Sequence, residues 1–241
     1  MKQNLVWLIF CIDRSGSMSS IKNDMIGGFN QFIKQQLEAN IGECRVFAYK
    51  FDDTYEVMFE DVDLKDVPIL DTNNYVPRGM TALYDAMAIT IDNVGARLAS
   101  MKEEDRPEKV LVVTITDGEE NSSRKFGQLD VANRVKHQQE VYNWSFAYIG
   151  ANQDSWAVGH SIGYVKGTTL DYTANTAGVA YAFDALKDST TVYRCAAGPS
   201  TRFKFTPSNP DEDEDEGNKI VKPAKTNSIK GKTTKAPTKK S

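Results

Sequence analysis

The sequence has few of the residues that hold zinc or carry out acid–base catalysis at neutral pH. Its 241 residues include three cysteines, widely spaced and odd in number, and two histidines. A disulfide framework needs paired cysteines and a thiolate metal site needs clustered ones, so this pattern argues against both and favours a reducing compartment. We therefore expect any metal site to use oxygen ligands.

Long apolar runs are also missing. No stretch approaches the ~20 apolar residues that cross a bilayer, so no membrane association is expected. The apolar run at residues 5–12 is similar to the core of a signal peptide, but Asp13 and Arg14 follow it where a cleavage site would have small residues. This run is interpreted as a buried strand, and a cytoplasmic location is predicted.

Charge is unevenly distributed. The net charge is −4, yet residues 211–216 read DEDEDE and eight lysines with no acid follow in residues 219–240. Such a composition buries too little apolar surface to offset its ordering entropy, so residues 207–241 are predicted to be a disordered tail. Two roles remain open for it, a solubilising tail or a tether that binds nucleic acid or an acidic partner through residues 219–240.

Residues 1–206 are predicted to form one α/β domain with an open, mostly parallel, doubly wound (Rossmann-like) sheet and helices on both faces. Strands alternate with helices of 15 or more residues, which is typical of βαβ units. Strands are expected at residues 5–12, 46–51, 55–59, 110–116 and 144–149, with a short one near 164–165. Helices are expected from residue 21 and at 83–101, 129–141, 155–162 and 174–186. Residues 191–205 fit either a last strand or a packed segment.

The two strongest apolar strands both end in an acid, Asp13 and Asp117. Ligands of open parallel sheets bind at the carboxyl ends of the strands, where the strand order reverses. In extended chain, residues 13, 15 and 17 face one direction, so Asp13, Ser15 and Ser17 converge there. Carboxylate and hydroxyl oxygens suit Mg²⁺, Mn²⁺ or Ca²⁺ better than zinc. The alternative interpretation is that Ser17, Ser19 or Ser20 caps the helix that begins near Ile21, and that Thr81 caps the next helix.

Three segments resemble, in content and order, the von Willebrand factor A (vWA) domain. DRSGS, from Asp13 to Ser17, resembles its D-x-S-x-S signature; RGMTALYDA, with Thr81, resembles its second segment; and TDGEEN, with Asp117 and Gly118, resembles its third. The resemblance spans residues 4–190 and implies a stand-alone intracellular bacterial or phage type.

The resemblance further implies a metal-ion-dependent adhesion site (MIDAS). Ser15, Ser17 and Thr81 would hold the divalent ion directly, while Asp13 and Asp117 would act through water or by orienting the hydroxyls. The strand at 5–12 would lie beside the strand at 110–116. A rim of side chains is expected to contact the partner: Arg78, Glu119, Glu120, Asn121, Asn152 and Asp154.

The predicted function is a protein-binding module that uses a divalent ion, Mg²⁺ or else Mn²⁺ or Ca²⁺, to grip an Asp or Glu of a partner. No catalysis is expected, since the sequence has no G-x-x-x-x-G-K-[ST] loop and no G-x-S-x-G elbow. His137 is expected at the surface and His160 in the core or at a rim. Two alternatives stay open: a metal-dependent phosphohydrolase with Asp13 as nucleophile, and a nucleic-acid-associated accessory protein.

Overall fold

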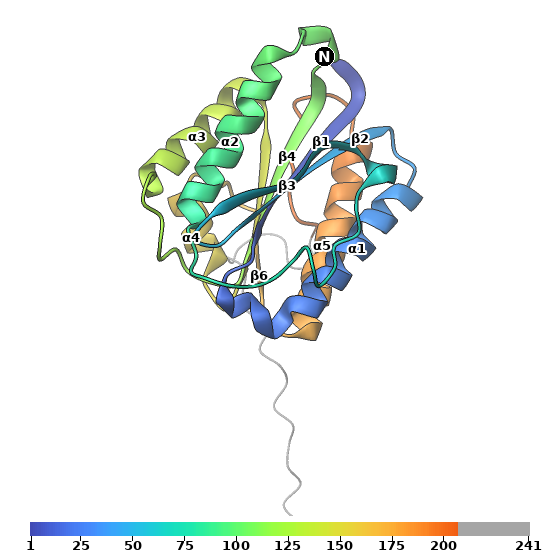
Figure 1. Ribbon diagram of the computed structural model, residues 1–241. Helices are drawn as coiled ribbons and strands as arrows, with labels where there is room; N and C mark the ends of the chain where they lie inside the picture. Colours follow the sequence, from blue (N-terminus) through green and yellow to red (C-terminus); the bar gives the residue numbers. More distant parts are fainter. Residues whose placement is uncertain (207–241) are drawn as a thin grey trace, which may run out of the picture.

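The computed structural model describes residues 1–206 as a six-stranded sheet between two layers of helices (Figure 1). The strands are β1 (Lys2–Asp13), β2 (Glu43–Phe51), β3 (Tyr55–Asp63), β4 (Pro107–Thr116), β5 (Ser145–Ala151) and β6 (Thr169–Tyr172). The helices are α1 (Lys22–Glu38), α2 (Leu83–Ser100), α3 (Gln128–Tyr142), α4 (Ser155–Ser161) and α5 (Thr176–Cys195). Three short 3₁₀ helices are η1 (Gly16–Ile21), η2 (Leu64–Asp66) and η3 (Glu103–Asp105).

The strand order is β3-β2-β1-β4-β5-β6, and only β3 runs antiparallel to its neighbour. The turn at Asp52 and Asp53 is too short for a crossover helix, so β3 folds back on β2 as a hairpin. β1 and β4 are adjacent, and the chain winds outward from them in both directions. This arrangement confirms the predicted doubly wound α/β class and places the switch point between the two acid-ending strands.

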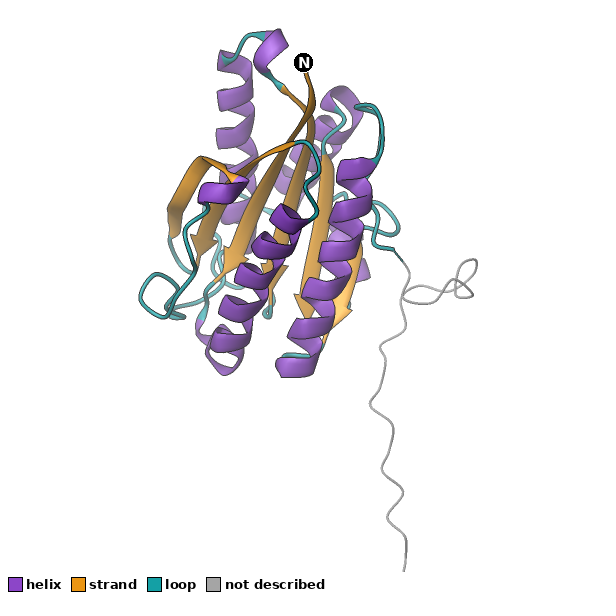
Figure 2. Cartoon of the chain, turned by 90° about the vertical axis from the view of Figure 1, so that its right-hand side faces the viewer, coloured by secondary structure: helices purple, strands orange, loops and turns teal. Residues whose placement is uncertain are grey.

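Alternate residues of the strands pack on opposite faces of the sheet. Figure 1 shows α1 and α5 on one side and α2 and α3 on the other, and Figure 2 shows the helices lying along the strands. Phe10 contributes to the core under α1 and α5, whereas Trp7 and Phe47 contribute to the core under α2 and α3. The central strands are covered on both faces, which explains their continuous apolar sequences.

The glycine pair in α1 has a packing role. A Cβ atom on Gly28 would lie 2.2 Å from a ring carbon of Phe183 on α5, whereas one on Gly27 would meet nothing within 4 Å. α1 tolerates the lower helix propensity of Gly28 because only a residue without a side chain lets α5 approach this closely.

Two of the expected elements near the C-terminal end are corrected. The predicted strand at 164–165 is wrong: Tyr164 lies between Gly163 and Gly167, both with positive φ, and the strand β6 begins later, at Thr169. Tyr164 is buried because its ring packs on Phe146 and Tyr148, and not because it belongs to the sheet.

The last helix is longer than expected. α5 continues to Cys195 because Tyr193 and Arg194 in its final turn are buried. Residues 196–206 form no strand, and Phe203 packs in the core with its N–H donating to Ser145 Oγ. The predicted tail at 207–241 lies outside the described residues.

Candidate metal centre

Three loops meet at the carboxyl end of β1 and β4, the lower end of the sheet in Figure 1. The loop after β1 is tied to the loop before α2 by hydrogen bonds from Gly16 N to Gly79 O (3.1 Å) and from Arg78 N to Arg14 O (2.7 Å). The loop after β4 joins them through Asn121 N, which donates to Thr81 O (3.0 Å). Segments a hundred residues apart in the sequence therefore share one site.

Asp13 lies at the base of this site and is fully buried. Its Oδ1 accepts a hydrogen bond from Ser15 N (2.6 Å) and its Oδ2 accepts one from Thr116 Oγ1 (2.6 Å). The hydroxyl of Tyr75, also buried, donates to the Asp13 carbonyl oxygen (2.6 Å). Both carboxylate oxygens are thus fixed in position beneath the loops.

The side chains of Ser15, Ser17 and Asp117 form a chain of oxygens above Asp13. Ser15 Oγ and Ser17 Oγ are 3.0 Å apart, and Ser17 Oγ donates to Asp117 Oδ1 (2.6 Å). A Cβ on Gly118 would lie 3.3 Å from Thr81 Oγ1 and 3.6 Å from Ser17 Oγ, so these two hydroxyls flank the same glycine. The five residues expected to gather around one ion are brought together.

Thr81 is buried, and its hydroxyl makes no hydrogen bond within residues 1–206. Only the backbone of Thr81 makes hydrogen bonds: Thr81 N donates to Asn121 Oδ1 (2.8 Å), and Thr81 O accepts from Asn121 N (3.0 Å). The N-cap of α2 is Ala82 and that of α1 is Ile21, neither with a side-chain capping bond. Ser17, Ser19 and Ser20 therefore do not cap α1 and Thr81 does not cap α2, so that interpretation is wrong. Ser15 occupies the N-cap position of η1 but makes no side-chain capping bond. The Thr81 oxygen is available to a ligand.

Both carboxylates are held where their charge is poorly solvated. Burial raises the pKa of Asp13 to about 6; hydrogen bonds from Thr116 and Ser15 oppose this effect, and the nearby charge of Asp117 adds to it. Burial also raises the pKa of Asp117, against the hydrogen bond from Ser17. A cation above the two acids would relieve this desolvation, so the donor set fits a divalent ion.

The chemistry of the donors fits hard ions. Two carboxylates and three hydroxyls are oxygen ligands of the kind that Mg²⁺, Mn²⁺ and Ca²⁺ take. Within residues 1–206 no group of three or more His, Cys, Asp or Glu side chains is placed to hold a metal ion. Any ion here is therefore held in large part by neutral hydroxyls.

An ion cluster supports the loop that carries Thr81. Arg14 Nε lies 3.1 Å from Asp52 Oδ2, and its Nη2 donates to Glu56. Arg78 binds the same two carboxylates, at 2.8 Å from Asp52 and 2.9 Å from Glu56. Burial opposes the ionisation of Asp52, but hydrogen bonds from Arg78 and Thr54 and the charge of Arg14 hold its pKa below the usual value. Arg78, expected to meet an acidic ligand, already has two acidic partners.

The rim residues after β4 divide into supporting and exposed groups. Glu120 accepts hydrogen bonds from the backbone N–H of Tyr84 (2.9 Å) and Ser123 (2.7 Å), so it fixes the start of α2. Asn121 holds the backbone of Thr81 in place. Glu119 is exposed and makes no hydrogen bond or ion pair in the described part of the chain, which leaves it available to a partner.

The rim residues after β5 have structural partners as well. Asp154 is the N-cap of α4, its Oδ1 accepting from Ala157 N (2.8 Å). Asn152 has a positive φ of 54° and its Oδ1 accepts from Ala174 N (3.2 Å). Both side chains remain exposed. Sequence reasoning missed Thr116 and Tyr75, since a threonine inside a strand and a tyrosine in a loop carry no pattern that points to Asp13.

Replacing Asp13 by asparagine is expected to stabilise the metal-free protein. A folded-state pKa of about 6 against an ordinary 3.8 means that protonation favours folding. This contribution is complete below pH 3.8 and is lost as the pH rises through 6. Asparagine is neutral and keeps the acceptor for Ser15 N, so at pH 7.5 in EDTA the free energy of unfolding should rise by about 1–3 kcal/mol. Denaturant titration measures this free energy of unfolding. The control Asp13→Ala loses both side-chain hydrogen bonds and should show no gain in stability. An equal loss of stability in both variants would contradict the prediction.

No family model matches the chain, and no curated protein sequence does either. Solved structures do match. The manganese-loaded TRAP protein of Plasmodium vivax is 17% identical, with a TM-score of 0.53 over 75% of this chain and 74% of that one. A von Willebrand factor type A protein from Catenulispora acidiphila is 14% identical, with a TM-score of 0.52 over 80% and 43% of the two chains. Proximal thread matrix protein 1 from the mussel byssus, with a zinc-occupied MIDAS motif, is 14% identical, with a TM-score of 0.52 over 78% and 46%.

At these identities the likeness concerns the fold, which is the vWA fold. The chain spans less than half the length of the last two proteins. Within residues 1–206, no helix is both long and apolar enough to cross a membrane.

Proposed function

We propose that this chain is a protein-binding module that captures an acidic residue of a partner through a divalent ion held by Asp13, Ser15, Ser17, Thr81 and Asp117. The observation that carries the proposal is the convergence of three loops on Thr81, a buried residue whose hydroxyl caps no helix, has no hydrogen-bond partner in residues 1–206 and is not itself sealed from solvent. A divalent ion, when bound, supplies a coordination position that a carboxylate of the partner can fill.

The residues of the chain prepare this capture. The Ser15, Ser17 and Thr81 oxygens are neutral, so they leave much of the ion's charge uncompensated for an incoming carboxylate. Asp13 orients the loop through Ser15 N, and Asp117 orients the Ser17 hydroxyl. Binding is then conditional on metal, because without a cation the two carboxylates repel an acidic partner.

Two observations favour binding over the alternative of phosphoester hydrolysis. Both oxygens of Asp13 already accept hydrogen bonds and the side chain is fully buried, which disfavours it as a nucleophile. The two histidines are exposed and lie on helices, His137 on α3 and His160 on α4, where the His160 ring lies tilted against that of Trp156 with the centroids 5.1 Å apart. The alternative of nucleic-acid binding rests on residues 219–240, which lie outside the described residues, and its test is salt-sensitive binding that is lost without them.

Metal titration tests the proposal. Calorimetry of the full chain with Mg²⁺, Mn²⁺ and Ca²⁺ is expected to show saturable uptake at one site; zinc belongs in the series because the mussel protein's motif is zinc-occupied. A fluorescent hexapeptide of alternating aspartate and glutamate should bind only with metal and be released by EDTA. Turnover of p-nitrophenyl phosphate above that of Asp13→Asn, or no metal uptake at all, would sink the proposal.

A further inference from the structure

Two exposed carboxylates border the proposed metal site. Asp53 lies in the turn between β2 and β3, and Glu119 lies in the loop after β4. We propose that these two acids select the partner by binding lysine or arginine side chains that flank the acidic residue held by the ion. The inference rests on the proposed function, because it concerns the segment that the same site would capture.

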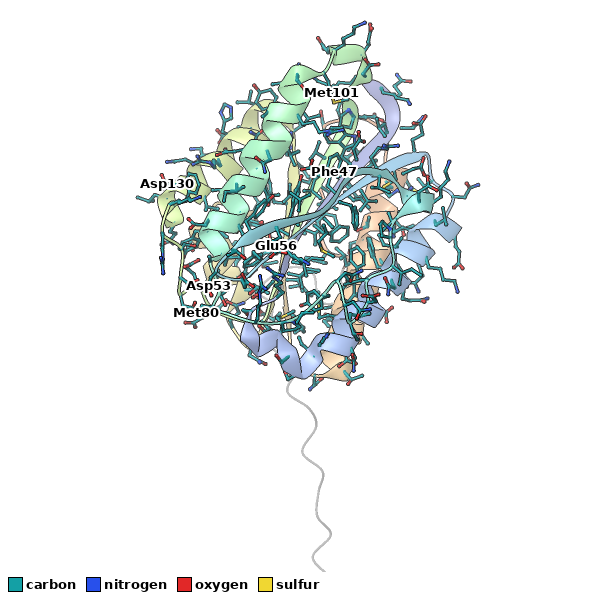
Figure 3. All side chains as sticks on the ribbon, viewed as in Figure 1. Phe47, Asp53, Glu56, Met80, Met101 and Asp130 are labelled. Carbon is teal, nitrogen blue, oxygen red and sulfur yellow. The ribbon has the colours of Figure 1, made fainter. Side chains whose placement is uncertain are left out.

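Asp53 is placed beside the loop that precedes α2. A Cβ atom on Gly79 would lie 2.6 Å from Asp53 Oδ2, so the carboxylate rests against the backbone of Gly79. Gly79 O in turn accepts a hydrogen bond from Gly16 N (3.1 Å), which belongs to the loop after β1. Figure 3 shows Asp53 with Met80 at this end of the sheet. The Asp53 carboxylate is therefore one backbone contact away from the loop that carries the metal-site serines.

Glu119 is placed on the other side of the site. The strand order β3-β2-β1-β4 puts the loop after β1 between Asp53, which follows β2, and Glu119, which follows β4. A Cβ atom on Gly118, the residue before Glu119, would lie 3.3 Å from Thr81 Oγ1. Asn121, two residues after Glu119, binds the backbone of Thr81. The chain on both sides of Glu119 is thus fixed to the site, while the Glu119 side chain is exposed.

The charges of Asp53 and Glu119 are uncompensated, unlike those of neighbouring acids. Asp52 pairs with two arginines, and Glu120 accepts backbone N–H groups. No hydrogen bond or ion pair within residues 1–206 involves the side chain of Asp53 or Glu119. The two exposed cations at residues 124–125 form no ion pair in that part of the chain either. A cation that neutralises the border must therefore come with the partner.

A buried polar group indicates what the two acids would flank. Thr81 is 2% exposed, and its hydroxyl has no hydrogen-bond partner in the described residues, so its oxygen is free to bind an ion. An ion there attracts a carboxylate of the partner, whereas Asp53 and Glu119 repel it. A segment that is only acidic gains from the ion and loses at the border. A segment with cations beside its acid gains from both.

The spacing of the partner's charges follows from extended geometry. In an extended segment, residues two apart point to the same side and lie about 7 Å apart. A lysine two residues before or after the acid therefore faces the site together with it, and its flexible four-carbon stem lets the ammonium group adjust to a carboxylate at the border. We expect one cation toward Asp53 and one toward Glu119.

Two serine peptides of seven residues with a central aspartate test the inference on the full chain. One has lysine two positions before and two positions after the aspartate, and the other has glutamine there. Both have blocked ends and an uncharged fluorophore. Each exposed ion pair contributes about two- to fivefold to affinity, so in saturating Mg²⁺ at low salt the lysine peptide should bind about tenfold more tightly. In about 1 M NaCl the screening length is about 3 Å, and the preference should shrink below about twofold.

A double variant, Asp53→Asn with Glu119→Gln, separates charge recognition from any effect on the fold. It should bind the lysine peptide about tenfold more weakly and the glutamine peptide equally or more tightly, because the repulsion of that peptide is removed. The control, Glu103→Gln with Asp105→Asn, removes the same two kinds of exposed acid on η3 at the opposite end of the sheet (Figure 1) and should bind both peptides like wild type. Calorimetry should give the same metal affinity in both variants to within about threefold, since neither acid pair is a proposed ligand.

The outcomes distinguish the inference from the proposed function. Equal affinity of wild type for the two peptides, with metal uptake and release by EDTA intact, overturns the charge selection and leaves the proposed function standing. A preference for lysine that persists in the double variant, or a loss of metal uptake there, overturns the roles given to Asp53 and Glu119. No metal-dependent binding of either peptide to wild type removes the proposed function and the inference together.

Discussion

Replacing Thr81 by valine is expected to abolish metal-dependent binding while leaving the fold intact. Valine has nearly the same shape as threonine, and the lost hydroxyl makes no hydrogen bond in the described residues, so folding loses little. The divalent ion loses a direct ligand, and its affinity should fall by on the order of 100-fold or more, since even supporting residues of metal sites contribute 10–100-fold. Calorimetric titration with Mn²⁺ and the melting temperature in EDTA measure the two effects separately.

Thr81→Ser and a threonine that is not one of the five proposed metal-site residues are the controls. Serine restores the oxygen without the methyl group, so metal uptake should recover to within a few-fold of wild type. Thr176→Val removes a surface hydroxyl that contacts Asp24, and metal affinity should not change. In wild type, metal at 100 times its Kd adds about 2.7 kcal/mol to the stability, and Thr81→Val should lose this increment. Equal metal affinity in Thr81→Val and wild type would contradict the assignment of this residue.

Replacing Arg14 by methionine is expected to destabilise the domain strongly. The Arg14 side chain is 4% exposed and pairs with Asp52, whose side chain is 3% exposed. Methionine keeps most of the volume but leaves Asp52 buried with one fewer cation. Breaking a buried pair from one side costs about 3–5 kcal/mol when the remaining charge is left uncompensated. Arg78 and Thr54 still bind Asp52, so the loss is expected at the lower end of this range. Urea denaturation in EDTA measures this loss apart from any effect on metal binding.

Arg78 provides a matched control for Arg14. It binds the same two carboxylates, Asp52 and Glu56, but its side chain is 57% exposed. Water replaces its contacts when it is removed, so Arg78→Met should cost no more than about 1 kcal/mol. Similar losses in the two variants would mean that burial does not govern this cluster. Arg14→Met should also weaken metal uptake, because Asp52 O accepts from Ala82 N (3.0 Å), next to Thr81.

Local patterns predicted most of the fold because the strands that matter are buried on both faces. The runs ending at Asp13 and Asp117 show this as continuous apolar sequence, and the apolar spacing of residues 83–101 gave α2 to within one residue at its end. The prediction failed where burial has another cause. Tyr164 is an aromatic in a turn between two glycines, so its hydrophobicity indicated a strand that is absent.

The convergence of the five proposed metal-site residues was predictable because they lie in three short motifs of oxygen-bearing side chains that resemble those of the vWA domain. The structural partners of the rim residues were not predictable, because exposed loop acids look alike in sequence whatever they contact. Glu120 and Asp154 accept backbone N–H groups at the starts of helices, and Arg78 neutralises Asp52. Their partners lie 3 to 36 residues away, at distances along the chain that no periodicity encodes.

The sequence by itself determined which oxygen atoms are available: two hydroxyls and two carboxylates just after the apolar strands β1 and β4, and the hydroxyl of Thr81 just before α2. It could do so because alternation and hydrophobicity act over a few residues. Only the tertiary structure decided that Thr81 caps nothing, that Arg14 is buried against Asp52, and that Thr116 and Tyr75 hold Asp13. Each of these depends on how β1, β4 and the loop before α2 are placed side by side. That placement is set by the packing of the whole sheet against its helices, which no single segment contains.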